Sequence, residues 1–349
     1  MIQDARHLWN RFRSTNGQII IFVAVLLVAM LGMVGLSIDL GYSFAERRTV
    51  QNAADAGAIA GARAVTQWST SNPDVTALAA VQSIVSANNM GNAKQKTTCY
   101  YVDDTNTDLT TCGDKVPASA TGVRLLVSET HSTFFIRIIP GAPKTATTSA
   151  SAIAHAQIVT PDGSGGPFIV CGGNANLVSG GSLPILLLQS GGTYAINPAA
   201  VGKTFEIHGK IDDCGAGSNR FKGLALGDVN AGKKLGDWFY GDDGEKTGPA
   251  NEVVSGVQGC SQTQVDPFDC VLYLPLATSN PPPKKIGNDN LFNIVAYGAF
   301  EVSSCGGTCK HQATLIGKYI IDTPSDLPSW TPGSWARGQN GIIAIRLTK

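Results

Sequence analysis

The sequence predicts a protein of the α+β class with a long N-terminal transmembrane helix, a helix-plus-sheet unit, and then a disulfide-linked all-β domain. Three observations support this prediction. Residues 18–38 carry no charge, and helix-forming residues follow them without a proline until Pro73. The second half of the chain consists of short apolar runs separated by glycine-rich turns. All eight cysteines follow the uncharged run.

Length and composition set the first limits. A chain of 349 residues is long enough for two folded units in addition to an anchor. Hydrophobic residues make up 43% and charged residues 15%, which is too apolar for a disordered protein. The formal net charge is +0, so no overall basic field is available to bind phosphates, and we expect no nucleic acid partner.

The membrane anchor is predicted at residues 18–38. Their sequence is QIIIFVAVLLVAMLGMVGLSI, and about 20 apolar residues cross a hydrocarbon core of about 30 Å. A cleaved secretory signal is the competing interpretation. The run is longer than the apolar region of such signals, and IDLGYSFAERR after it contains no small-x-small cleavage site. We therefore expect an uncleaved, single-pass protein of the cell membrane.

Orientation follows from the cysteines, because arginines lie on both sides of the span. An even number of cysteines on one side of a membrane indicates disulfides in an oxidising compartment, although buried thiols are the alternative. We expect residues 1–17 in the cytoplasm and the body in the periplasm or outside the cell. Spacing favours three pairs and leaves a fourth: Cys99–Cys112, Cys260–Cys270, Cys305–Cys309 and Cys171–Cys214.

One helix is predicted from Gly17 to Thr66, with a length of about 75 Å. Its second half carries small residues at four-residue spacing, which allow helix backbones to approach closely. We expect this face to associate with another helix; packing against the protein's own body is the alternative. The predicted helix-association face comprises Ala53, Gly57, Gly61, Ala54, Ala58 and Ala62.

The segment that contains this helix resembles a known family. The matching elements are Gly17-Gln18, the exit sequence GLSIDLG at 35–41, Arg47-Arg48, and the QNAADA run at 51–56. Together they are similar to the N-terminal region of the TadE/TadG-like proteins of the Tad (Flp-type, tight-adherence) pilus assembly system. The resemblance covers about 50 residues and implies a pilin-like component whose helix inserts into a helical bundle.

Two departures refine this resemblance. Pilins and TadE-like pseudopilins usually carry a glutamate five residues after their cleavage site, where this chain has Phe22. This difference favours an uncleaved, TadG-like anchor. Some TadG-like proteins also carry a von Willebrand factor A domain, but the nearest metal motif, at residues 162–166, lacks a ligand and follows Pro161. We interpret that segment as part of a linker.

The exported body divides into two predicted parts. Residues 39–159 form a pilin-like unit, with a second helix that starts at Asn72-Pro73-Asp74 and strands at 98–102, 122–128 and 149–159. Residues 160–167, TPDGSGGP, form a linker. Residues 168–349 form the β-rich domain, because their apolar runs are short and separated by turns.

We expect no catalytic, cofactor or metal site, and hence no enzyme. The Gly202-Lys203-Thr204 string lacks the earlier glycine of a phosphate loop. Cys305, Cys309 and His311 are zinc-type donors without a fourth ligand, so a short disulfide loop is favoured. The residues Asp104, Asn106 and Asp108 have the spacing of a calcium loop, but Leu109 occupies the glycine position, which favours a polar hairpin tip.

The resulting hypothesis is a membrane-anchored pilus assembly protein or minor pilin-like subunit that acts by helix-mediated association. Its expected partners are membrane lipid, other pilus assembly or pilin-like proteins, and further copies of itself. The alternative is an anchored surface module for adhesion or carbohydrate binding that shares only the anchor with the family. Asp39, at the end of the span, is expected at the level of the lipid headgroups.

Overall fold

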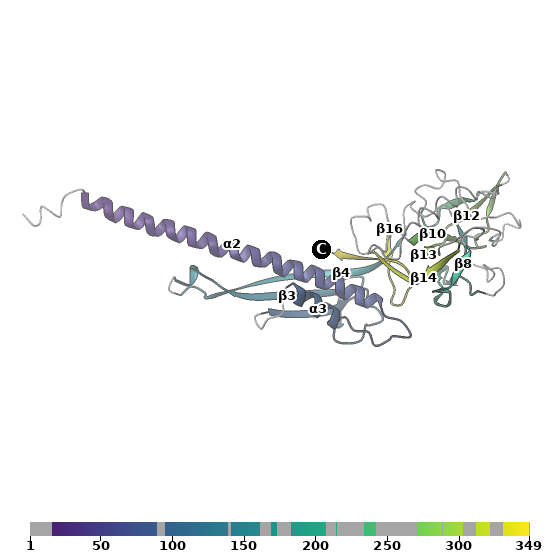
Figure 1. The fold of residues 1–349 in the computed structure, drawn as a ribbon, viewed down its shortest axis with the longest axis horizontal. Coiled ribbons are helices and arrows are strands. Elements are labelled where there is room, and N and C mark those ends of the chain that lie inside the picture. The colour runs from purple at the N-terminus through teal and green to yellow at the C-terminus, as the bar shows by residue number, and fades with distance from the viewer. Residues whose placement is uncertain are drawn as a thin grey trace, which may run out of the picture. The chain divides into compact units, whose positions relative to one another are not determined.

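The structure is a computed structural model of the whole chain (Figure 1). It describes residues 16–88, 95–138, 141–160, 169–172, 183–206, 214, 234–241, 271–287, 289–302, 312–321 and 331–348. The chain forms two compact units. Unit 1 comprises Met1–Ala58, Ala79–Cys99 and Arg124–Ala152, and unit 2 comprises Ile59–Leu78, Tyr100–Val123 and Ile153–Lys349.

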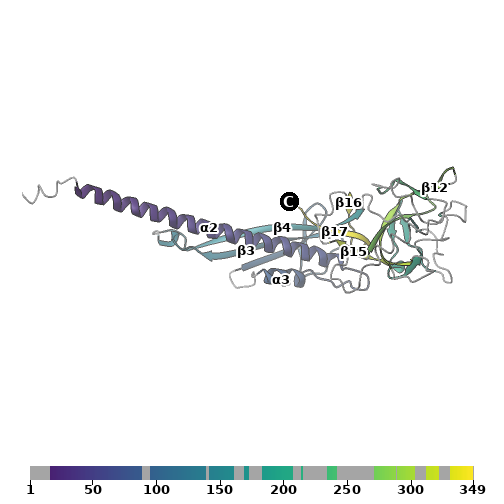
Figure 2. The ribbon, with the colours of Figure 1, turned by 45° about the horizontal axis from the view of Figure 1, so that its top comes forward.

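The N-terminal helix α2 spans Asn16–Thr66, which confirms the predicted helix to within one residue. It contains no proline, and its glycines are offset by many alanines and leucines. In unit 1, α2 lies beside strands β3 (Gly122–Ser132) and β4 (Thr145–Thr160), and its N-terminal part extends past them (Figures 1 and 2). Every residue of the helix from 19 to 34 is exposed.

The small residues in the C-terminal part of α2 let the helix pack closely against the rest of the chain. The predicted helix-association face is buried within the chain: Ala53, Ala54, Gly57, Ala58, Gly61 and Ala62. A Cβ atom on Gly57 would lie 2.4 Å from Leu125 Cδ2 of β3 and 3.3 Å from Val85 Cγ2 of the second helix. Burial in the chain is the alternative that the sequence left open, and contact of this face with other helices stays a prediction.

The second helix, α3, spans Leu78–Ala87, so the predicted start at Asn72-Pro73-Asp74 is wrong. Asn72 instead pairs with Ser69 in an isolated bridge, in which each backbone N–H donates to the other's carbonyl. The backbone after it bonds to the sheet region, because Val116 N donates to Val75 O and Leu78 N to Cys112 O. These tertiary hydrogen bonds outweigh the local capping signal.

The largest sheet has seven strands in the order β15-β17-β4-β3-β1-β2, with β16 paired to β4. The predicted strands at 98–102, 122–128 and 149–159 are confirmed as parts of β1, β3 and β4. The remaining strands of this sheet are β1 (Gln95–Val102), β2 (Asp108–Thr111), β15 (Lys318–Ile321), β16 (Thr331–Ser334) and β17 (Gly341–Thr348).

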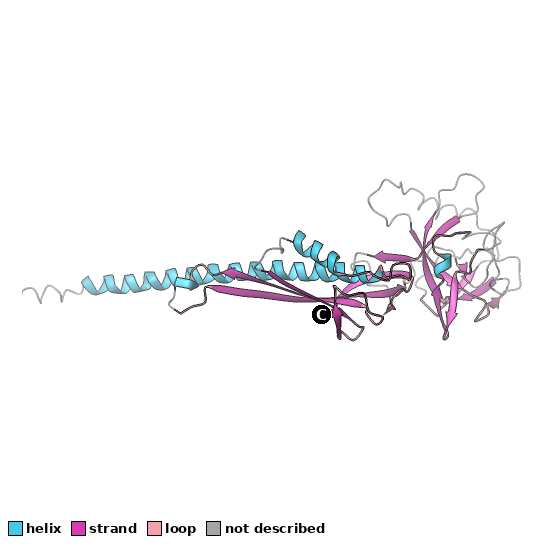
Figure 3. Cartoon of the chain, turned by 90° about the horizontal axis from the view of Figure 1, so that it is seen from below, coloured by secondary structure: helices cyan, strands magenta, loops and turns pink. Residues whose placement is uncertain are grey.

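The rest of unit 2 is rich in strands, as the short apolar runs predicted (Figure 3). A five-stranded sheet has the order β5-β10-β13-β14-β8, and smaller sheets join β11-β12-β9 and β6-β7. Their bounds are β5 (Val170–Cys171), β6 (Leu187–Ser190), β7 (Thr193–Ile196), β8 (Thr204–Glu206), β9 (Trp238–Gly241), β10 (Val271–Ala277), β11 (Lys284–Ile286), β12 (Asp289–Asn293), β13 (Ala296–Val302) and β14 (Gln312–Ile316). A 3₁₀ turn, η2, spans Pro198–Ala200.

Two apolar clusters form the core of this region. One contains Phe205, Leu274 and Phe300, and the other contains Phe239, Phe292 and Ile342. The last strand, β17, pairs antiparallel with β4, from Ile343 opposite Ile158 to Thr348 opposite Ile153. The C-terminal strands β16 and β17 thus belong to the same sheet as β4. The boundaries at 39–159, 160–167 and 168–349 stay predictions.

We predict that Gly57→Leu lowers the free energy of unfolding by about 1–3 kcal/mol or more, because the buried site has no room for a side chain. Gly41→Leu is the matched control, since a Cβ at Gly41 of the same helix meets nothing within 4 Å. Urea unfolding of both full-length variants in detergent micelles measures the difference. Equal midpoints would show that the packing around Gly57 does not support the fold.

Candidate functional site

The candidate site is the segment of α2 at which the rest of the protein begins to cover the helix. Large apolar side chains are exposed from Ile19 to Phe44, and among the described residues α2 is the one helix long and apolar enough to cross a membrane. From position 35 onward one stripe of the helix is covered. Its first members, Gly35 and Asp39, are buried one turn apart, and Ser43 follows half-buried. This finding is consistent with a single-pass membrane protein.

Asp39 is the central residue of the site, and it is the one charged residue between positions 19 and 45. Its side chain is 5% exposed. Three consecutive backbone N–H groups donate to its carboxylate: Phe134 N to Oδ1 at 2.8 Å, Phe135 N to Oδ2 at 3.0 Å and Ile136 N to Oδ2 at 2.7 Å. Such charge-assisted bonds are stronger than neutral ones, and an ionised carboxylate accepts all three.

The donors lie at the tip of the β3–β4 hairpin, which we define as residues 133–138. A short 3₁₀ turn, η1 (Ile136–Ile138), starts here, so its first N–H groups have no partner within the turn. Thr133 closes the base of the tip, because its N–H donates to Lys144 O and its Oγ1 donates to Pro143 O. The Asp39 carboxylate therefore acts as the cap of the turn across 95 residues of sequence.

Side chains reinforce this contact between helix and hairpin. The Tyr42 ring packs edge-to-face with His131 at 5.3 Å and with Phe134 at 5.4 Å between centroids. Ser43 Oγ lies 3.2 Å from His131 Nε2. A Cβ atom at Gly35 would lie 2.8 Å from Phe135 Cβ, so the close approach of the hairpin requires glycine at this position. Further along the hairpin, burial and the neighbouring Glu46 carboxylate raise the pKa of Glu129.

In unit 2, the C-terminal end of α2 is held by residues from far along the chain. Lys318 Nζ donates to the carbonyls of Thr66, at 2.7 Å, and Trp68. A positive charge at the C-terminal end of a helix also interacts favourably with the helix dipole. Burial opposes the charged form and lowers the pKa of Lys318. The Arg337 guanidinium stacks 4.2 Å from the centre of the Trp68 ring.

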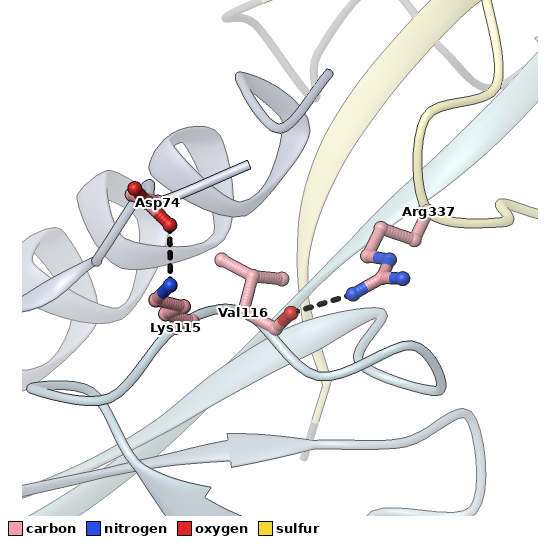
Figure 4. Close-up of polar contacts among 4 residues, drawn as sticks. All are labelled: Asp74, Lys115, Val116 and Arg337. Atoms are coloured by element: carbon pink, nitrogen blue, oxygen red, sulfur yellow. Dashed lines mark hydrogen bonds and ion pairs between the residues drawn. The ribbon is translucent and has the colours of Figure 1, made fainter. Parts of the chain in front are cut away.

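Arg337 also fixes the loop before β3. Its Nη1 donates to Val116 O at 2.8 Å, as Figure 4 shows. The neighbouring Lys115–Asp74 ion pair, at 2.6 Å, is also visible in Figure 4. The two side chains of this pair are 72% and 69% exposed, so it contributes little to stability. The partly buried contacts of Lys318 and Arg337 therefore contribute more at this end of α2 than this ion pair does.

The residues with the predicted calcium-type spacing lie in the hairpin turn between β1 and β2 and at the start of β2. Asp103, rather than Asp104, organises the turn, because Asp103 Oδ1 accepts from Thr105 N, Thr105 Oγ1 and Thr107 N. Asn106 has a left-handed backbone (φ 65°), and its Oδ1 lies 2.7 Å from His155 Nε2. The Asn106 side chain thus contacts β4, and the described residues contain no cluster of three metal-ligating side chains.

The other side chain contact of His155 is Thr121. His155 Nδ1 lies 3.0 Å from Thr121 Oγ1, so both ring nitrogens have a partner. Burial lowers the pKa of His155, although the Asp103 and Asp104 carboxylates offset part of this shift. The imidazole is therefore a buried, neutral bridge between β4 and two loops.

The cysteines are cross-linked where the structure describes them. Cys171 forms a disulfide with Cys214, with 5.5 Å between their Cα atoms. Cys99 and Cys112 are also disulfide-bonded, and each is the chain neighbour of one member of the Tyr100–Thr111 pair. Four further predicted positions lie outside the described residues: Cys260, Cys270, Cys305 and Cys309.

The phosphate-loop-like string is described by the structure, whereas His311 of the zinc-type motif and the segment 162–166 lie outside the described residues. Gly202 lies in a left-handed turn and Thr204 starts strand β8, so no helix follows the Gly202-Lys203-Thr204 string as a phosphate loop requires. Phe134, Phe135 and Ile136 are site residues that had no predicted role. An apolar run inside a hairpin connection was the signal that pointed to them.

Comparison with known proteins finds one family model that matches the N-terminal region of the chain. Residues 17–64 match the model of a family described as putative Flp pilus-assembly TadE/G-like. The predicted resemblance is thus confirmed for this region, which includes Gly35, Asp39 and the buried small residues. The match and the apolar helix fit a membrane protein related to pilus assembly. No curated protein and no solved structure matches the chain.

We predict that Asp39→Asn loosens the hairpin tip, because an amide has one acceptor oxygen and its NH₂ group opposes the N–H donors. Amide hydrogen exchange of Phe134, Phe135 and Ile136 should accelerate at least about tenfold. Asp55→Asn removes the same charge from the same helix, where the carboxylate accepts from Gln51 Nε2, and should leave the tip protected. Unchanged exchange in the Asp39 variant would contradict the capping role.

A second prediction concerns pH. Because the pKa of His155 in the fold is below its ordinary value of 6.5, the unfolded chain binds a proton first as the pH falls. The contribution of His155 to stability is complete above pH 6.5 and declines below it. His155→Gln should cost about 1–3 kcal/mol at neutral pH. Urea unfolding should show a smaller difference from the wild type at about pH 5. A constant difference would argue against a neutral, buried imidazole.

Proposed function

We propose that this protein is a membrane-anchored pilus assembly protein or minor pilin-like subunit of a Tad-type system. In this proposal it has no catalytic role, its N-terminus is cytoplasmic and its body is exported. The observation that carries the proposal is the division of α2. The part of α2 that runs along the body has a buried face of small residues, whereas the part from Ile19 to Val34 is uncovered on all sides, and the family match at residues 17–64 includes both parts.

The uncovered half supplies the surface for association. A helix that is apolar all round is stable where lipid or other helices surround it. Gly32 lies in this half, and a Cβ there would meet nothing within 4 Å, so another helix can approach the backbone closely. Association through this half would join the chain to other pilus components or to its own copies, and the body would be displayed outside the membrane.

The Asp39 contact supports this role, because it joins the body to the helix at the end of the uncovered half. A displacement of the helix would therefore be transmitted to the hairpin through short hydrogen bonds. A body attached by a loose linker would lack this coupling. The geometry favours a structural or assembly role over a tethered binding module for this reason.

We predict that replacing residues 19–34 with an unrelated apolar span of equal length abolishes surface appendages while the chain stays in the membrane. The replacement leaves Gly35, Asp39 and the whole body unchanged. A gene-deletion strain is complemented with either the wild-type or the altered chain, and sheared appendages are counted by electron microscopy. Membrane fractionation serves as the control for insertion.

Two outcomes would contradict the proposal. If the deletion strain makes normal appendages, the protein is not required for their assembly. If the unrelated span restores appendages fully, the sequence of the uncovered half does not specify a partner. The second result would favour the alternative, in which the span is an anchor for a surface module.

A further inference from the structure

The hairpin tip combines exposed aromatic rings with backbone N–H groups that are hydrogen-bonded within the protein. Phe134 and Phe135 are 52% and 43% exposed, and Arg137 beside them is exposed. The backbone N–H groups of residues 134–136 are nevertheless all bonded to Asp39. This combination differs from an ordinary water-exposed loop, in which polar side chains face solvent and water satisfies the backbone.

Contacts with Gly35 and Asp39 also fix the position of the tip along the axis of α2. Exposed apolar side chains on the helix run from Ile19 to Phe44, a distance of about 39 Å at 1.5 Å per residue. This length exceeds the hydrocarbon core of about 30 Å and approaches the roughly 40–45 Å of a bilayer with its headgroup regions. Since the tip bonds to residue 39 and packs on residue 35, it lies within this apolar stretch.

A membrane that surrounds the exposed stretch of α2 therefore also meets the tip. At this depth water is scarce, so unpaired backbone N–H groups and an unpaired carboxylate would each be costly. Asp39 and the three N–H groups satisfy one another, which lowers both costs. Aromatic rings are favoured at the membrane interface, and an arginine there can extend its guanidinium toward lipid phosphates.

We propose that the hairpin tip is a second membrane contact, with Phe134 and Phe135 inserted at the boundary between lipid headgroups and acyl chains. This inference rests on the proposed anchoring of α2. The continuity of the rings with the uncovered helix surface favours lipid as the occupant over a protein partner. The contact would hold the base of the body at the membrane surface and limit its tilt about the helix.

Site-specific photocrosslinking tests this proposal. p-Benzoylphenylalanine replaces Phe134 in the full-length chain, which is reconstituted in vesicles of phosphatidylcholine and phosphatidylglycerol. The control carries the same group in place of Leu126, which is 41% exposed on β3 and about 26 Å further along the strand direction. Mass spectrometry after irradiation should find lipid adducts at position 134 and few at position 126.

Other outcomes would overturn the proposal. Adducts at position 134 with a second protein chain would assign the tip to a protein interface, and equal lipid labelling at both positions would show no specific insertion. If the Phe134 variant does not fold, the same group in place of Arg137, which is exposed, replaces it.

Vesicle flotation separates failure of this inference from failure of the proposed anchoring. A chain that floats with vesicles but yields no lipid adduct at the tip contradicts the second contact alone. A chain that remains in the soluble fraction contradicts the insertion of α2 as well.

Discussion

The capping of three backbone N–H groups by the Asp39 carboxylate is the interaction on which the arrangement of unit 1 depends. A carboxylate in an otherwise uncharged stretch of helix is unfavourable unless hydrogen bonds satisfy it, and a hairpin tip with unpaired N–H groups is unfavourable in the same surroundings. Each group provides what the other lacks. The position of this pair therefore determines where the body meets the helix and how much of α2 stays uncovered.

The two compact units solve different problems with the same helix. In unit 1, small residues let α2 approach β3 and α3 closely, as the contact of Gly57 with Leu125 shows. In unit 2, where α2 ends, its last carbonyls need partners, and Lys318, 252 residues away, donates to the carbonyl of Thr66 and to that of Trp68 just beyond the helix. Contacts of such sequence separation specify the end of the helix more strictly than local propensity does.

Much of this fold could be predicted from the sequence, because its signals are local. The helix from Gly17 to Thr66 and the alternating strand at 149–159 have a clear periodicity. The helix start at Asn72 was wrong, since the backbone there bonds to residues that a local pattern does not contain. The partner of Asp39 was missed for the same reason: its donors are backbone groups, so the apolar run at positions 134–136 does not reveal which residue they bond.

Side-chain size along α2 shows how one helix can serve two environments. Bulky residues such as Phe22, Leu26 and Met30 occupy the uncovered half, where no protein surface of the chain restricts their volume. Alanine and glycine occupy the buried stripe after Val50, where the distance between backbones is small. Covering of the helix begins between Gly35 and Asp39, because Gly35 is the first position at which the hairpin excludes a side chain. The absence of a side chain at Gly35 thus allows the hairpin to approach the helix at this boundary. The hydrogen bonds of the Asp39 carboxylate then hold the hairpin at this position along the helix.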